Sequence, residues 1–265
     1  MGWLPRHGRV LLRFWSTALA SQTEYLFNFS VELLAMAGNL AGSWFVLSLF
    51  FRHGQQLGGW RWEEALVVLG AYTLLDGVAT TLLRPNLNAI VTLVQNGSLD
   101  FVLLKPIDSQ FWLSTRLIAP VGLPQIALGA GLMLWAAARA GAVPSPLALA
   151  STTVLLLAAS VSLYSLWFLV AATSIWFTKI WNATEVLRNV LVAGRYPISA
   201  YPSGMRSLLT LVLPVAFLTT VPAEALLGRA GSHPLPLALL VAAGLFTASR
   251  LFWRHALRFY TSASS

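Results

Sequence analysis

Six long apolar stretches constrain this chain more than any other feature of its sequence. They lie at about residues 26–51, 65–83, 111–138, 147–177, 207–228 and 235–252. A helix needs about 20 mostly apolar residues to cross a hydrocarbon core that is about 30 Å thick. Only 10% of the 265 residues are charged, whereas soluble domains have about 25%. The sequence therefore predicts an all-α integral membrane protein with six transmembrane helices, forming a single transmembrane domain over residues 1–265.

Prolines interrupt the fifth stretch. A helix that contains Pro214 loses a backbone hydrogen bond and kinks, and irregular backbone at membrane depth needs protein or a water-filled cavity around it. Residues 214–228 are therefore expected to form a kinked fifth helix and then a short re-entrant helix near the outer face. The alternative is a plain spanning helix with an ordinary proline kink. Glu224, which follows Pro222, is expected to cap the short helix, where the helix dipole favours a carboxylate; a contact with substrate is the alternative.

The first 24 residues predict an amphipathic helix at the membrane interface. Three arginines share one helical face: Arg6, Arg9 and Arg13. Leucine and tryptophan side chains share the opposite face. Such a helix lies on anionic lipid with its apolar side inserted, unless a partner protein covers that side instead.

Lysine and arginine are distributed unequally between the two sides of the predicted membrane domain. Four arginines fall on one side: Arg52, Arg61, Arg139 and Arg229. All the other lysines and arginines fall in the N-terminal segment, the second and fourth connections, and the C-terminal tail. Cytoplasmic loops carry the excess of basic residues. We therefore expect both termini and the loops at 84–110 and 179–206 to be cytoplasmic, with short helices at 86–94 and 181–192.

Two acidic residues lie inside the predicted spans. Glu32 is in the first span and Asp76 in the second, each about 12 Å from the cytoplasmic end by helix geometry. Ionisable groups at that depth usually face a cavity or a partner. Together with Asn39 they are candidates for the lining of a substrate path. The alternatives are proton coupling, or a structural role in which each acid is neutral or paired with Arg116 or an asparagine.

The sequence lacks the motifs of an enzyme or a metal site. A phosphate-binding loop needs Gly-Lys-Ser/Thr, but the two lysines, Lys105 and Lys179, follow leucine and threonine. There is no cysteine, and the four histidines have no metal-ligand spacing. The formal net charge of +8 fits basic residues kept on one membrane face better than nucleic-acid binding. We therefore expect no catalysis, no metal or cofactor in this chain, and no nucleic-acid partner.

Residues 97–106, Gly-Ser-Leu-Asp-Phe-Val-Leu-Leu-Lys-Pro, resemble the G-x-L-D…L-x-K-P signature that follows the second span in permeases of the ABC type-2 exporter family. The proline-broken residues 207–228 resemble that family's fifth span and extracellular short helices. The amphipathic N-terminal segment resembles its connecting helix. The resemblance covers nearly the whole chain in order and spacing, and is closest to the stand-alone bacterial permeases.

This resemblance implies the permease subunit of an ABC exporter in the cytoplasmic (inner) membrane. The family implies a dimer with an identical or related permease and two separate ATPase subunits, which bind ATP and Mg and drive alternating access. Coupling to the ATPases maps onto the cytoplasmic loop within residues 84–110, at Gly97, Leu99, Asp100, Leu103, Leu104, Lys105 and Pro106. The alternative for this loop is an interfacial helix on lipid. The mixed polar and apolar lining expected for the cavity favours an amphipathic or apolar substrate.

Two other classes of function remain open at the level of sequence. An ion-coupled secondary transporter or channel would work without an ATPase, through Glu32 or Asp76. A membrane scaffold would bind another complex and transport nothing. The two halves of the chain show no convincing internal repeat, which a secondary carrier would favour. Co-purification with an ATPase of separate sequence would distinguish the exporter from the carrier.

Overall fold

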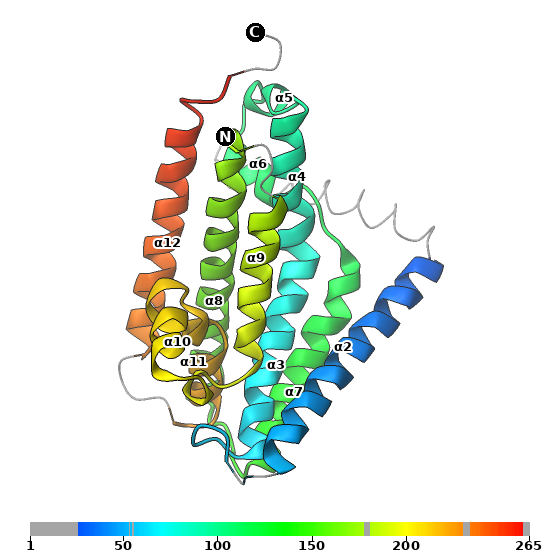
Figure 1. Ribbon diagram of the computed structural model, residues 1–265, viewed down its shortest axis with the longest axis vertical. Coiled ribbons are helices and arrows are strands. Elements are labelled where there is room, and N and C mark those ends of the chain that lie inside the picture. The colour runs from blue at the N-terminus through cyan, green and yellow to red at the C-terminus, as the bar shows by residue number, and fades with distance from the viewer. Residues whose placement is uncertain (1–25, 53, 55, 178–180, 230–233, 262–265) are drawn as a thin grey trace.

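The fold is a bundle of helices that run along the long axis of the molecule (Figure 1). The computed structural model describes residues 26–52, 54, 56–177, 181–229 and 234–261, so the predicted amphipathic helix at 1–24 lies outside the described residues. Within these described residues, five helices are long and apolar enough to cross a membrane: Phe29–Arg52, Trp62–Gln95, Pro120–Arg139, Pro146–Ile175 and Leu235–Ala256. A sixth is added if the bent pair Ser203–Leu211 and Ala216–Leu226 counts as one span. The predicted all-α, multi-pass membrane fold is confirmed.

The second span is longer than predicted. Helix α3 (Trp62–Val78) continues through a π-helical turn, η1 (Ala79–Leu83), into α4 (Arg84–Gln95), and together they form one helix of 34 residues. The prediction that a loop begins at residue 84 and contains a separate helix at 86–94 is therefore wrong. Pro85 lies in the first turn of α4 and has no N–H to donate, and the preceding π turn absorbs this defect without ending the helix.

The third span is shorter than predicted and is broken. Helix α6 (Ser109–Thr115) is separated from α7 (Leu123–Arg139) by non-helical residues 116–119 and the single turn η2 (Pro120–Gly122). A continuous span over residues 111–138 is therefore wrong. Proline at 120 removes a helical donor, and the freed backbone groups of the break find partners on α4, described below.

Helices α3 and α7 lie unusually close together. A Cβ atom added to Gly129 of α7 would lie 2.3 Å from the backbone nitrogen of Leu74 on α3. A Cβ atom added to Gly77 of α3 would lie 2.7 Å from the backbone nitrogen of Ile126 on α7. Glycine at these positions lets the two backbones approach, as small residues do between membrane helices.

The segment between the fourth and last spans differs most from expectation. After α8 (Pro146–Ala172), helix α9 (Trp181–Leu191) lies beside α8 and α3 (Figure 1), with Leu187 buried in their common core. It was predicted to be a surface helix in a cytoplasmic loop. It is instead amphipathic within the bundle, with an apolar side toward the core and polar residues toward a cavity.

The predicted break at Pro214 is present. Two arms, α10–η6 (Ser203–Ser207, Leu208–Val212) and η7–α11 (Ala216–Thr220, Val221–Leu226), meet there at 76°. This bend excludes a plain spanning helix. Both arms lie toward the end of the bundle opposite α5, where α12 (Pro234–Ala256) begins (Figure 1).

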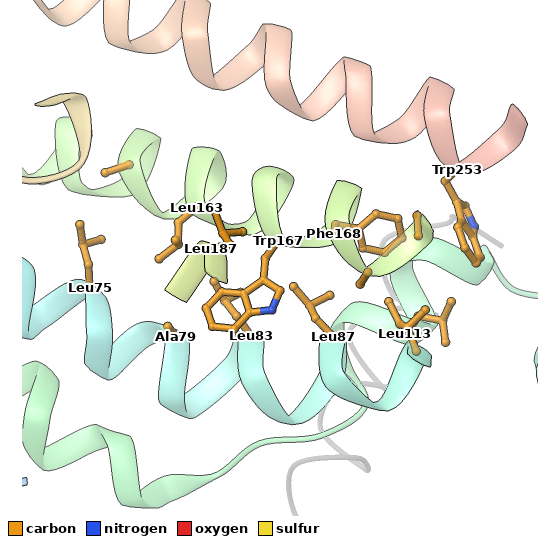
Figure 2. Close-up of a cluster of buried hydrophobic side chains, with 14 of the residues drawn as sticks. Leu75, Ala79, Leu83, Leu87, Leu113, Leu163, Trp167, Phe168, Leu187 and Trp253 are labelled. Carbon is orange, nitrogen blue, oxygen red and sulfur yellow. The ribbon is translucent and has the colours of Figure 1, made fainter. Parts of the chain in front are cut away.

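One apolar core runs through the bundle from the α5 end towards its middle. Figure 2 shows Trp167 and Phe168 of α8 between the α3–α4 helix and Trp253 of α12. Phe168 contacts Trp253 edge to face, with ring centroids 5.5 Å apart. Leu83 and Leu87 face Trp167 from the long helix, and Leu187 of α9 joins the same cluster.

Candidate functional site: a polar cavity and an exposed apolar segment

A polar cavity of about 420 Å³ lies between α2 (Leu26–Arg52), α3, the start of α7 and α9. All three residues that the sequence singled out for a substrate path, Glu32, Asn39 and Asp76, line it. The structure therefore brings together residues from two predicted spans. It adds side chains that the sequence analysis placed in loops or left out: Tyr72, Thr80, Arg84, Gln125, Arg188, Asn189 and Arg195.

Asp76 is held by two donors inside this cavity. Its carboxylate accepts a hydrogen bond from Gln125 Nε2 at 2.7 Å and forms an ion pair with Arg84, two helical turns along the same helix. Arg84 also donates to Thr80 Oγ1 at 2.9 Å. Pairing of Asp76 with Arg116, one of the predicted alternatives, is not found, because Arg116 stacks over the Trp112 ring at 4.5 Å.

Arg195 links three elements across the cavity. Its Nη2 donates to Asn39 Oδ1 of α2 at 2.9 Å, and its guanidinium lies 5.0 Å from the centre of the Tyr72 ring on α3. Arg195 itself lies in η4 (Val192–Arg195), the turn that follows α9. Arg188, Val192 and Arg195 recur at spacings of four and three residues, so they share one helical face. That periodicity is the signal in the sequence that could have placed them in a cavity.

The predicted coupling segment forms a short surface helix at the extreme end of the molecule. Helix α5 (Asp100–Leu103) follows a turn at Gly97, whose φ of 67° favours glycine. Phe101 and Leu104 are 71% and 81% exposed, whereas Leu99 is completely buried. Figure 1 places α5 at the end opposite α10 and α11.

The predicted coupling residues therefore divide into two groups. Leu99, together with Val102, anchors the segment in the core that contains Leu87 and Trp253. Leu103 and Leu104 lie on the surface. Lys105 lies over the face of Trp112, 4.7 Å from the ring centre. The segment thus joins a firm apolar anchor to an apolar outer surface.

An ion pair connects the coupling segment to the last span. Asp108 pairs with Arg250 of α12, with Nη1–Oδ1 at 2.7 Å, and also accepts from the Phe111 N–H at the start of α6. The hydrogen bond from Arg250 is the main reason that the pKa of Asp108 lies below its ordinary value. Next to it, Gln110 donates to Tyr164 Oη at 3.0 Å, and Trp253 Nε1 donates to Ser109 Oγ at 3.0 Å. No pattern in the sequence predicted this junction.

The same core links the coupling segment to the cavity. Leu75 and Trp167 belong to the cluster that holds Leu99, and they also line a small apolar hollow of about 30 Å³. That hollow shares Tyr72 and Arg84 with the polar cavity. A displacement of α5 therefore has a continuous set of packed side chains through which it can reach the cavity wall.

The opposite end of the bundle contains a buried carboxylate, Glu64. Glu64 accepts from the N–H and Nε of Arg61, at 2.8 and 2.9 Å, and pairs with Arg229 after α11. Pro222 lies in the first turn of α11, but Glu224 does not cap that helix. Helix α11 continues directly from η7, so its amide groups already have helical partners.

Within the described residues, no group of three or more histidine, cysteine, aspartate or glutamate side chains could hold a metal ion. The candidate site therefore consists of a charged cavity, an apolar hollow beside it and an exposed apolar segment at one end of the bundle.

The chain is similar to a known protein family. A family model described as ABC-2 family transporter protein matches residues 37–264. No curated protein and no solved structure gives a significant match. The matched range covers residues 97–106, the proline-broken pair and all of the cavity lining except Glu32, Ala35 and Met36.

Proposed function

Because the chain belongs to the ABC-2 family of transporter proteins, and is therefore a permease of an ABC transporter, we propose that it exports an amphipathic or apolar substrate. Permeases of this family are membrane subunits and generally work with ABC ATPase partners. The proposed assembly has two ATPase subunits, which bind ATP and Mg, and a second permease that is identical or related. It lies in the cytoplasmic membrane with both termini in the cytoplasm.

The coupling segment carries this proposal. An apolar surface formed by Phe101 and Leu104 at the tip of a membrane protein suits a groove on another protein. Its anchor, Leu99 and Val102, prevents the segment from moving independently of the bundle. ATP-driven closure of the two ATPases would move the segment and, through the core, change the exposure of the cavity.

The test is a charged substitution on the exposed face of this segment. Leu104→Glu is expected to leave the permease folded, because the side chain is 81% exposed, but to abolish substrate-stimulated ATPase activity and export in proteoliposomes. Val143→Glu is a matched control at a 95% exposed position between α7 and α8. It is expected to keep both activities.

Two results would contradict the proposal. One is purification of the active permease from its native membrane without any ATPase, since an ion-coupled carrier needs none. The other is wild-type ATPase stimulation and export in the Leu104→Glu variant and also in either Asp100→Arg or Leu103→Glu.

A further inference from the structure

More positive than negative side chains line the polar cavity. Three arginines, Arg84, Arg188 and Arg195, face two carboxylates, Glu32 and Asp76. Asp76 is occupied by Arg84. Arg188 pairs with Glu185 at 3.2 Å, but both side chains are about half exposed, so this pair is weak. Within the part of the chain that the structure describes, no carboxylate lies within ion-pair distance of Arg195.

Arg195 is incompletely satisfied by the groups around it. Its neighbours here are uncharged, Asn39 Oδ1 and the Tyr72 side chain, and its Nε is buried without any hydrogen-bond partner. Arg84 Nε is likewise buried without a partner. Guanidinium groups have donors in a planar arrangement that fits the oxygens of a carboxylate or phosphate. Partly buried cations of this kind gain from a ligand that brings a negative charge.

An apolar wall adjoins these cations. The polar cavity that holds Arg84 and Arg195 is also lined by the apolar side chains of Met36, Val121 and Val192. A ligand that placed an anionic group between Arg195 and Arg84 would therefore have apolar side chains next to it. A hydrophilic anion would gain nothing from that wall.

We propose that the cavity binds the anionic headgroup, a phosphate or carboxylate, of an amphipathic substrate. Arg195 is the principal anion-binding residue, Arg84 is the second, and the apolar part of the substrate lies against Met36, Val121 and Val192. This assignment rests on the proposed transport function and names its substrate class. Asp76 competes with the substrate for Arg84, so the pair also limits how tightly the substrate is held.

The experiment measures binding of dodecyl phosphate to the full chain in phosphatidylcholine nanodiscs, with any co-purifying subunit retained and no ATP added. The comparison probes are dodecyltrimethylammonium, which has the same chain and the opposite charge, and inorganic phosphate, which has no chain. We expect dodecyl phosphate to bind about tenfold more tightly than either, as one charge-assisted interaction provides.

The variants test the assigned residues. Arg195→Gln can still donate to Asn39 but has no charge, and is expected to weaken dodecyl phosphate binding about tenfold, with partial recovery in Arg195→Lys. Asp76→Asn frees Arg84 and is expected to tighten binding several-fold. Arg139→Gln, at an exposed arginine at the end of α7, is the control and is expected to change nothing.

Three results would overturn the assignment: equal affinity for the two dodecyl probes, inorganic phosphate binding as tightly as dodecyl phosphate, or unchanged affinity in folded Arg195→Gln. The probe comparison on the wild-type chain needs no variant, so it decides the question even where a substitution prevents folding. Because no ATPase activity is measured, failure here leaves the transport assignment standing, and failure of the Leu104→Glu test leaves this one standing.

Discussion

Asn86 shows how one side chain can stabilise a broken membrane helix. It is completely buried, its Nδ2 donates to the Leu117 carbonyl at 2.7 Å, and its Oδ1 accepts from the Leu117 N–H at 2.9 Å. The Ala119 N–H donates at 2.9 Å to the carbonyl of Thr81, four residues before Pro85. The Thr81 carbonyl, which has no helical donor because Pro85 lacks an N–H, thus accepts a hydrogen bond from an N–H in the break before Pro120.

The substitution Asn86→Leu is expected to destabilise the protein. It keeps a similar volume but removes both hydrogen bonds to the Leu117 backbone, at about 0.5–1.5 kcal/mol for each bond. Thermal unfolding in detergent, compared between the variant and wild type, measures the loss. Asn189→Leu, at an exposed asparagine of α9, is the control and is expected to change the stability by less than about 0.5 kcal/mol. Equal melting temperatures for Asn86→Leu and wild type would contradict the proposed role.

The cavity residues show what could be predicted at this scale. Glu32, Asn39 and Asp76 were predicted because they are polar positions inside apolar stretches, where polarity costs free energy. Arg84 and Arg195 were not, because arginines at the edges of such stretches are equally expected at a cytoplasmic face. Their place in the cavity depends on how far each helix extends, which the sequence did not reveal.

Among the elements, α6 and α12 are joined by the Asp108–Arg250 pair, and this junction predicts a dependence on pH. The pKa of Asp108 is lowered by Arg250, so its carboxylate stabilises the fold above the ordinary value of 3.8. That contribution is lost as pH falls below 3.8 and through the lowered pKa.

We expect the melting temperature of the wild-type protein in detergent to fall by a few degrees between pH 5 and pH 3. Asp108→Asn is expected to melt lower at pH 5 and to change less over the same range, because its side chain does not titrate. Glu63→Gln, at a carboxylate at the other end of the bundle, provides the control. Parallel melting curves for wild type and Asp108→Asn would contradict this role of the pair.

The residues at which helices begin and end were harder to predict than the presence of the helices themselves. Proline was expected to mark boundaries, but the helix continues past Pro85 and is broken before Pro120. The difference lies in tertiary partners, since a π turn accommodates the first proline while α4 provides hydrogen bonds to the second break. Helix α9 was missed as a buried element because Arg188 and Asn189 face a polar cavity, so its sequence is as polar as that of a loop.

For the whole molecule, the sequence predicted the class of fold and the end at which the coupling segment lies relative to the proline-broken pair. Apolar length and the distribution of basic residues were sufficient for that. They were insufficient for the cavity, which depends on contacts between residues far apart in the chain, such as Asn39 with Arg195 and Asp76 with Gln125.

The 34-residue helix from Trp62 to Gln95 has a mechanical consequence. At 1.5 Å per residue it is roughly 51 Å long, against a hydrocarbon thickness of about 30 Å. Roughly 20 Å of it must therefore project beyond the lipid tails or tilt among the headgroups. A movement imposed on the projecting end of so long a helix would reach the membrane interior through one continuous element. The π turn, at Ala79–Leu83, is where the helix would bend if that end were held.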